Sequence, residues 1–156
     1  MANQSAGAID SRLLLNGTHT LTTLVIRFNA TIERETVSFS VQNAAPTVAQ
    51  TIQVSASGTR SNPAQLSGQT LAGSVAIFVA PSTLVRKVDF WLDKNNLLGS
   101  PRSTDSLAPL DFNGTAGSGQ ANLFNVGSLA AGPHRVAVRV TYTNGTTAIL
   151  SGNFVK

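Results

Sequence analysis

Residues 134–146 read HRVAVRVTYTNGT and carry the clearest structural signal in the chain. Apolar residues alternate with polar or small ones from His134 to Tyr142, the pattern of a strand with one buried and one solvent-facing side. Asn144-Gly145 follows, and Asn-Gly is the strongest short hairpin signal because both residues tolerate positive φ. The apolar pattern then resumes and continues to Val155. We therefore predict that the chain ends in a β-hairpin.

The same pattern recurs upstream. β-Branched and aromatic residues alternate with polar ones between turns rich in Gly, Pro and Asn, and no segment carries a convincing helical period. The predicted strands are Leu21 to Phe28, Thr36 to Val41, Ile52 to Ala56, Leu71 to Val79, Val85 to Leu92, His134 to Tyr142 and Thr146 to Val155. The sequence therefore predicts an all-β protein.

An internal repeat is the most informative feature of the organisation. The segment from Ile9 to Leu21 aligns without a gap with the segment from Phe124 to Val136, and leucine, glycine and histidine coincide. His19 thereby corresponds to His134, and each histidine is followed by a strand, a turn and a second strand. We predict that the N-terminal segment is the closing hairpin of one repeat and that the rest is a whole second repeat.

The repeat divides the chain into three parts. Residues 1–43 are predicted to be a partial repeat, residues 44–50 a linker, and residues 51–156 a complete sandwich. Pro46 supports the linker because proline blocks continuous strand pairing. The last part has about the 100 residues that a two-sheet sandwich needs.

Composition narrows the class of protein. Of the 156 residues, 12% are charged and 42% are apolar, a balance that exported β proteins often show. The chain has no cysteine, which excludes disulfides, thiol catalysis and thiolate metal sites. Residues 1–6 lack the basic and apolar regions of a signal peptide, and no run of about 18 apolar residues could form a membrane span. We expect an extracellular or cell-surface location, with any signal peptide or anchor outside this chain.

The net charge of +4 does not predict a nucleic-acid partner. Lysines and arginines are spread along the chain, and only Arg86 and Lys87 are adjacent. Phosphate recognition favours a clustered basic stripe with stacking aromatics. We expect neither nucleic acid nor a membrane as a partner.

Motifs spread over the second repeat carry a family resemblance. They are Arg60-Ser61-Asn62-Pro63, Leu66-Ser67-Gly68-Gln69-Thr70, Ala76-Ile77-Phe78-Val79, Val88-Asp89-Phe90-Trp91-Leu92-Asp93, Ala108-Pro109-Leu110-Asp111-Phe112 and Leu129-Ala130-Ala131-Gly132-Pro133-His134. Together they resemble the bacterial Ig-like repeats of large secreted and cell-surface proteins. The resemblance implies an immunoglobulin-like antiparallel β-sandwich of about seven strands, here with an additional N-terminal β-hairpin.

In that family such repeats act as spacers, or as adhesive and carbohydrate-associated modules beside other domains. Two positions depart from the family pattern. Leu110 stands where a tyrosine is common, and Lys94 stands where an acidic residue is common. Any polar or metal role of these two positions in the family is therefore in doubt here.

No set of residues points to catalysis. His19 and His134 are the only histidines, and their duplication within the same turn and strand favours a packing role over that of a general base. The chain has no Gly-x-Ser-x-Gly elbow, and the glycine-rich residues 114–119 lack the lysine of a phosphate loop. We expect no catalytic residue and no cofactor.

Asp89, Asp93, Asp105 and Asp111 raise the question of a calcium site, which needs six to eight oxygen ligands. Their spacing fits no known calcium loop. Asp93 and Asp111 are interpreted as turn and cap residues, and we expect no metal site.

Trp91 is the side chain whose placement could signal recognition. Val88, Phe90 and Leu92 share one face of their predicted strand, so Trp91 falls on the other face with Asp89 and Asp93. An exposed tryptophan beside carboxylates could stack on a sugar ring, with Trp91, Asp89 and Asp93 as the ligand-binding residues. The alternative is that a loop, the N-terminal hairpin or a neighbouring subunit covers Trp91.

The N-terminal hairpin is predicted to need a covering partner, since an isolated hairpin is only marginally stable in water. It can add to its own sandwich, pair with the hairpin of a second chain, or complete a sheet in the next subunit; alternatively, it is a fragment of a longer array. We hypothesise self-association of residues 9–41 into an oligomer or polymer. The residues expected to carry it are Leu24, Ile26, Phe28, Val37, Phe39 and Val41.

Five Asn-x-Ser/Thr sequons offer glycosylation sites in a suitable exported host. They lie at Asn3, Asn16, Asn29, Asn113 and Asn144. Asn-Gly-Thr is also ordinary turn chemistry, so both interpretations remain. The predicted function is a non-catalytic structural or adhesive module of a surface, fibre or shell protein. A carbohydrate-binding accessory module, possessing an exposed Trp91, is the alternative.

Overall fold

The structure, a computed structural model, describes residues 9–11, 14–44, 47–94 and 97–156. Residues 1–6, in which no signal peptide is predicted, the sequon at Asn3, Arg12 and Leu13 of the repeat, and Ala45-Pro46 of the linker lie outside the described residues. Two compact units are present, residues 1–45 with the turn 143–146, and residues 46–142 with 147–156. Each unit is described by itself.

The first unit is built around an antiparallel hairpin of β1 (Gly17–Ile26) and β2 (Ile32–Val41). Gly17 lies opposite Val41 and Ile26 lies opposite Ile32, with no irregularity between them. The turn is closed by two backbone hydrogen bonds, from the N–H of Arg27 to the oxygen of Thr31 and from the N–H of Ala30 to the oxygen of Arg27, both at 2.9 Å. Alternation of β-branched and polar residues, as predicted, gives two long strands.

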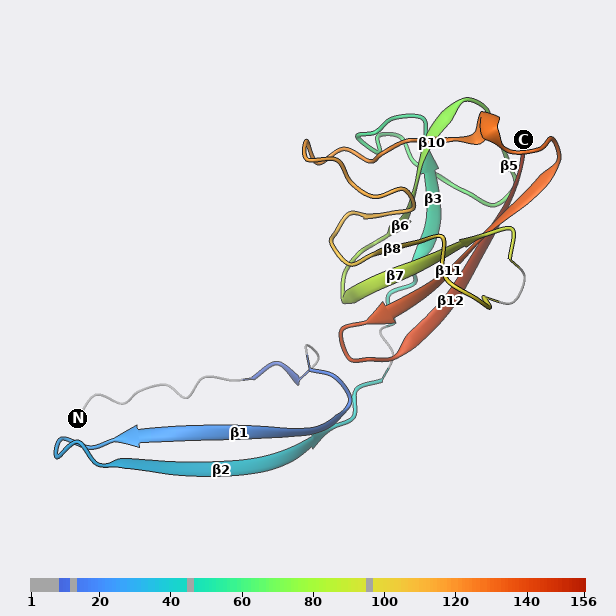
Figure 1. The fold of residues 1–156 in the computed structure, drawn as a ribbon. Coiled ribbons are helices and arrows are strands. Elements are labelled where there is room, and N and C mark those ends of the chain that lie inside the picture. The colour runs from blue at the N-terminus through green and yellow to red at the C-terminus, as the bar shows by residue number, and fades with distance from the viewer. Residues whose placement is uncertain (1–8, 12–13, 45–46, 95–96) are drawn as a thin grey trace. The chain divides into compact units, whose positions relative to one another are not determined.

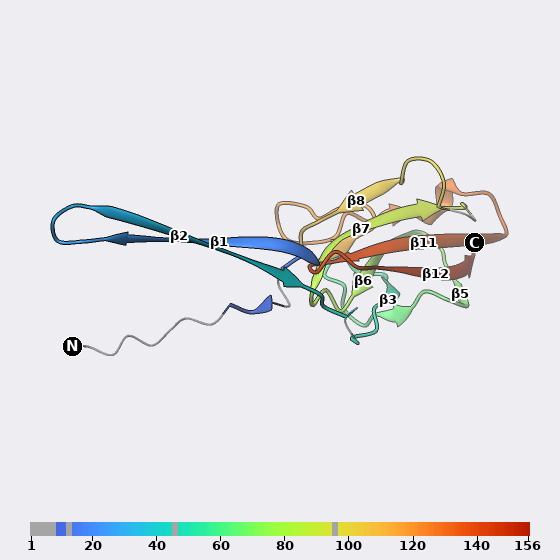
Figure 2. The same cartoon turned by 90° about the horizontal axis from the view of Figure 1, so that it is seen from below.

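The second unit is a sandwich of two five-stranded sheets, which lie in separate layers in Figures 1 and 2. The first sheet contains β10 (Phe124–Asn125), β6 (Ser74–Ala80), β3 (Thr51–Ser55) and β4 (Ala64–Gln65) in that order, with β9 (Leu110–Asp111) also paired to β6. The second has the order β5 (Gln69–Thr70), β12 (Thr147–Val155), β11 (Pro133–Tyr142), β7 (Val85–Leu92) and β8 (Ser103–Asp105). The predicted all-β, immunoglobulin-like sandwich is confirmed.

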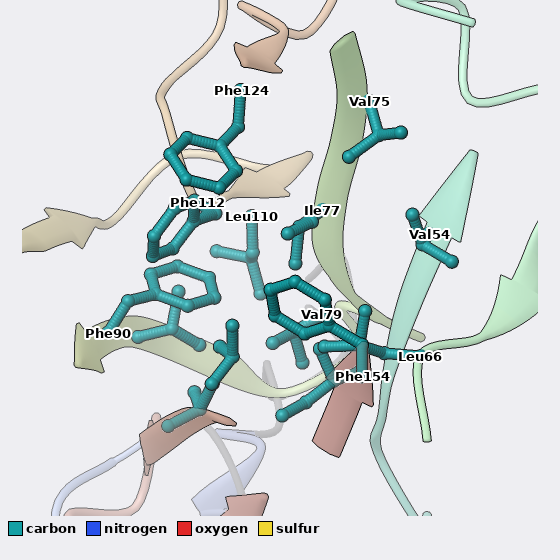
Figure 3. Packing of buried hydrophobic residues seen from close by; sticks show 14 of the residues in the cluster. Val54, Leu66, Val75, Ile77, Val79, Phe90, Leu110, Phe112, Phe124 and Phe154 are labelled. Carbon is teal, nitrogen blue, oxygen red and sulfur yellow. The ribbon is translucent and has the colours of Figure 1, made fainter. Parts of the chain in front are cut away.

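The core lies between the two sheets and takes every second residue of the long strands. In β11, Val136, Val138 and Val140 are fully buried, while Arg139 between them points the other way. Three phenylalanines form a row at the centre, visible in Figure 3 as Phe90, Phe112 and Phe124. Each neighbouring pair meets edge to face, with centroids 5.6 and 5.1 Å apart. Their contacts join β7 and β10 across the core and favour one packing arrangement.

All seven predicted strand runs contain a strand, but the boundaries differ at several ends. β1 begins at Gly17, earlier than the predicted Leu21, and β6 begins at Ser74, later than the predicted Leu71. Five further strands, each two or three residues long, were not predicted; they are β4, β5, β8, β9 and β10. A period of two cannot be recognised in so few residues, so these strands are set by tertiary pairing.

Within the described residues, the two hairpins of the predicted repeat can be compared strand by strand. Adding 115 to a residue number in β1–β2 gives the corresponding residue of β11–β12. Thr18 opposite Ser40 thus corresponds to Pro133 opposite Val155, and Ile26 opposite Ile32 to Thr141 opposite Thr147. The glycines at the base of the two hairpins have similar backbone angles, with φ of 134° at Gly17 and 124° at Gly132. The two hairpins therefore have the same register.

The turns of the two hairpins are also copies. In the first, the Asn29 side-chain oxygen accepts from the backbone N–H and the hydroxyl of Thr31, at 3.1 and 2.6 Å. In the second, Asn144 makes the same two bonds to Thr146, at 3.0 and 2.8 Å. The three-residue loops are 28–30 and 143–145, and the third residue of each, Ala30 or Gly145, has a positive φ. This is the usual conformation of three-residue hairpin loops.

Candidate functional site

Trp91 lies on the predicted face of β7 but is not exposed. Only 1% of it is accessible to solvent, and its indole N–H donates to the carbonyl oxygen of Gly99 at 3.4 Å. The guanidinium of Arg139 lies over the ring, 5.3 Å from the centroid. The carbohydrate-binding alternative required an exposed Trp91, and that prediction is therefore wrong. Strand alternation fixes which face a side chain takes, but it does not say whether a loop covers that face.

Asp89, the second residue of the predicted sugar site, is also buried and holds three partners. It accepts from the hydroxyl of Thr104 at 2.7 Å, from Arg139 at 2.9 Å and from the Lys87 ammonium at 3.2 Å. Burial pushes the pKa of Asp89 upward, but the bonds from these three groups outweigh it and hold the pKa below its usual value. The carboxylate is occupied within the fold and links β7, β8 and β11.

Asp93, the third predicted ligand-binding residue, is bound to His134. Its carboxylate accepts from Nδ1 of His134 at 2.8 Å and from the backbone N–H of Arg135 at 2.9 Å. Nε2 of the same ring donates to the carbonyl oxygen of Ala130 at 2.9 Å. The bond to Ala130 and then the bond to Asp93 raise the pKa of His134, since both acceptors favour the protonated ring. The pair lines a shallow depression together with Pro133 and Asn153.

The duplicated histidines have the packing role expected of them. His134 stacks on Phe154 with ring centroids 5.5 Å apart, and His19 stacks on Phe39 at 5.8 Å. Nε2 of His19 also lies 2.7 Å from a carbonyl oxygen four residues earlier, that of Leu15. Each histidine thus closes the base of its hairpin in the same way.

The other two aspartates are also bonded to groups within the fold. Asp111 is buried against Arg60, whose Nε donates to it at 2.8 Å, and the hydroxyl of Thr115 also donates to it. The hydrogen bond to Asp111 raises the pKa of Arg60 above its usual value. Asp105 accepts from the backbone N–H groups of Leu107 and Asp111, at 3.1 and 2.9 Å, as a turn residue does. Among the described residues, no three histidine or acidic side chains gather closely enough to hold a metal ion.

The six residues predicted to carry self-association do not share one face of the hairpin. Leu24 and Ile26 lie on one face by strand alternation, and Val37 and Phe39 lie on the other. Phe28 belongs to the turn and is fully exposed, whereas Val41 at the base is buried. A partner that covers one face of the ribbon can therefore contact only part of the predicted set.

Near its base, the first hairpin resembles the second in polarity as well as in backbone. Leu21 and Phe39 correspond to the buried Val136 and Phe154 of the sandwich. The face that carries them is called here the inner face, because its counterpart in β11–β12 faces the core. In this half, the hairpin has the pattern of a sandwich element.

Near the turn, the polarity of the inner face is reversed. Arg27 and Glu33 form an exposed ion pair, with 2.7 Å between nitrogen and oxygen. The corresponding residues of the second hairpin are Tyr142, which is buried, and Ala148, which packs against the core. Burying such an ion pair costs more desolvation than its attraction returns unless further hydrogen bonds satisfy it. This half is therefore not built to face a core as β11–β12 does.

The outer face near the turn carries exposed apolar side chains beside Arg34, which lies opposite Leu24. Leu24 and Ile26 stand where the second hairpin has Arg139 and Thr141. Ile32 lies directly opposite Ile26, and Phe28 follows in the turn. These four exposed side chains, Leu24, Ile26, Phe28 and Ile32, are called here the tip patch; Ile26 is 73% exposed. Sequence alternation predicted the strands, but only the comparison of aligned positions reveals the exchange of faces.

The sequons differ in how open their side-chain nitrogens are. Asn144 is 3% exposed, and its Nδ2 donates to the carbonyl oxygen of Ala44 at 2.8 Å. Asn16 and Asn113 are exposed, but their Nδ2 atoms donate to Asn43 and Leu123. Asn29 is exposed in the turn of the first hairpin. In this structure, modification at Asn144 requires the turn to open.

Comparisons with known proteins find only distant similarity. No protein-family model matches the chain, and no curated protein matches it. Among solved structures, it is similar to a chain described as "Structures of Clostridium thermocellum CbhA fibronectin(III)-like modules". The identity is 13% and the TM-score 0.40, over 90% of this chain and 62% of that one. The assignment of an immunoglobulin-like sandwich therefore depends on the sheet topology itself. Within the described ranges, no helix is long and apolar enough to span a membrane.

Proposed function

We propose that the chain is a non-catalytic structural or adhesive module of an extracellular, surface or assembly protein, and that it self-associates through hairpin β1–β2. It would work like the bacterial Ig-like repeats that its motifs resemble. The observation that carries the proposal is the reversed polarity of the hairpin near its turn. There the tip patch stands where the sandwich hairpin has polar residues, while Arg27, Glu33 and Glu35 stand where it has residues that face the core. Val25 and Arg34 do not follow this exchange.

The tip patch is more apolar than a free ribbon needs. Single exposed apolar residues are ordinary on protein surfaces, but adjacent ones at the end of a two-stranded ribbon favour a binding role. A hairpin that only continued an array of sandwiches would keep the polarity of β11–β12 along its whole length. The low fraction of charged residues, 12%, supports an exported setting. Because the chain has no cysteine, its stability there comes from packing rather than from disulfides.

The mass in solution tests this function. We expect light scattering to give a mass that rises with concentration for the full chain and stays at that of one chain after deletion of residues 1–43. Circular dichroism and Trp91 fluorescence must show that the remaining sandwich is folded. A full chain that stays monomeric at every concentration would contradict the proposal.

A matched pair of substitutions localises the contact. Ile26 in β1 and Ile149 in β12 are both exposed isoleucines, at 73% and 66%. Ile26→Lys is expected to weaken self-association, and Ile149→Lys to leave it unchanged. The opposite result would move the contact from the hairpin to the sandwich.

A further inference from the structure

The two outer edges of hairpin β1–β2 differ in charge. β1 has no Asp, Glu, Lys or Arg from Gly17 to Ile26, whereas β2 carries Glu33, Arg34 and Glu35 in succession. Charged side chains on an edge strand discourage pairing with another chain. β1 lacks this protection over its ten residues, and threonine, valine and isoleucine favour strands. The edge of β1 is therefore the one open to pairing.

The hydrogen-bond pattern shows which backbone groups are at that edge. The N–H of Arg27 donates to Thr31 across the hairpin, so the odd-numbered residues of β1 bond to β2. In an antiparallel ladder the bonded and non-bonded pairs alternate, so the even-numbered residues direct their N–H and C=O groups away from β2. These residues are Thr18, Thr20, Thr22, Leu24 and Ile26. In the part of the chain that the structure describes, no strand pairs with this edge.

The sandwich copy shows that the corresponding edge accepts a strand. β7 pairs antiparallel with β11 from Val136 to Tyr142. Beyond β7, the N–H of Asp93 donates to the carbonyl oxygen of Arg135 at 2.9 Å. Arg135 is the counterpart of Thr20, so the same position of the ladder is bonded in one copy and open in the other.

The choice of partner strand follows from the edges that a second copy would offer. Its β7 already lies between β11 and β8. Its β12 has an outer edge that is open only up to about Gly152, because β5 and Gly68 bond to the residues beyond. Its β1 offers a full ten residues without charge, so antiparallel pairing places no like charges opposite each other.

We propose that the outer edge of β1 is a strand-pairing site that takes β1 of a second copy of this chain in antiparallel orientation. This inference rests on the proposed self-association and adds its geometry. The product is a four-stranded sheet of order β2-β1-β1-β2 with two-fold symmetry. Its outer strands are the charged ones, so growth of the sheet stops at two chains.

Two proline variants of the full chain test the proposal. Thr22 and Thr36 lie opposite each other in β1 and β2, and both direct their N–H away from the partner strand. Proline is tolerated at such edge positions and removes one outward donor without breaking the hairpin ladder. Thr22→Pro therefore blocks the edge of β1, and Thr36→Pro blocks only that of β2.

Sedimentation of both variants gives the readout. We expect Thr22→Pro to weaken dimerisation about tenfold or more, since two outward bonds are lost by symmetry, and Thr36→Pro to match the unmodified chain. Thr22→Lys and Thr36→Lys repeat the comparison without altering the backbone, in case a proline unfolds the hairpin. An effect confined to the Thr36 variants, or a chain that assembles equally well with either edge blocked, would overturn the β1 pairing while leaving self-association in place. Species larger than a dimer would overturn it as well. A monomeric unmodified chain would instead remove the proposed function itself.

Discussion

Hairpins β1–β2 and β11–β12 share register, turn and histidine stack, yet among the described residues only the second has neighbours in a larger sheet. The backbone of a hairpin is thus set by local features, namely the Asn-x-Thr turn and the strand pattern. What differs is the surface that the backbone presents. In β11–β12, every inner-face residue from His134 to Tyr142 contributes to or borders the core, whereas the inner face of β1–β2 carries the ion pair of Arg27 and Glu33 near the turn. Local sequence decides that a hairpin forms, and face polarity decides what it can pack against.

The largest expected contrast is between the two stacked phenylalanines. Phe154→Ala should lower the free energy of unfolding of the sandwich by about 3–5 kcal/mol, because the side chain is fully buried in the core. Phe39→Ala should change it by less than about 0.5 kcal/mol, since Phe39 belongs to the other compact unit and independent sites contribute additively. Urea unfolding followed by Trp91 fluorescence measures both. Equal losses in the two variants would mean that the hairpin is part of the sandwich's cooperative unit.

The turns give a contrast of opposite sign. Gly145 has φ of 85°, whereas its counterpart Ala30 holds φ of 60° with a side chain that disfavours it. Gly145→Ala should destabilise its hairpin by about 1 kcal/mol, and Ala30→Gly should stabilise the other by a similar amount. Amide hydrogen exchange of β2 and β12 resolves the two hairpins. Loss of protection in β2 on replacing Ala30 would contradict the shared turn geometry.

A pH dependence should distinguish the sandwich hairpin. The pKa of His134 is raised in the folded state, so its contribution to stability is complete below the unfolded pKa of about 6.5 and is lost as the pH rises through the folded pKa. Between about pH 6 and pH 9, the unmodified chain should lose more stability than His134→Gln does. Asp93→Asn serves as a control and should remove part of the difference. A stability advantage of the unmodified chain over His134→Gln that grows with rising pH would show that the sign is reversed.

The smallest effect is expected at the ion pair of the first hairpin. Arg27 and Glu33 are both more than half exposed, and solvent screens such pairs. Arg27→Gln should therefore change the stability of β1–β2 by no more than about 0.3 kcal/mol. Hydrogen exchange of β1 provides the measurement. A larger loss would place this pair in a water-excluded setting and would indicate that the tip is covered.

The sequence predicts the long strands and the internal repeat because both leave a regular pattern in the order of residues. It does not predict the burial of Trp91, since its cover comes from Gly99, eight residues away, and from Arg139 on another strand. Nor does it predict the pairing of Asp93 with His134, which are 41 residues apart and meet only when β7 lies beside β11. The faces of the first hairpin could have been found from sequence by comparing Arg27 and Glu33 with Tyr142 and Ala148. The alternation of residues within one hairpin does not reveal this difference in polarity between the two hairpins.

The shared register has a consequence for how such a protein can diversify. Because residues 22–36 occupy the same backbone positions as residues 137–151, either segment is a cassette that can be transplanted into the other hairpin without a change of length or turn. The contacts of His19 with Phe39 and of His134 with Phe154 lie outside these segments and are therefore unchanged by the exchange. Substitutions in the half of a hairpin near its turn can then change what it binds, while the residues at its base that fix its fold stay the same.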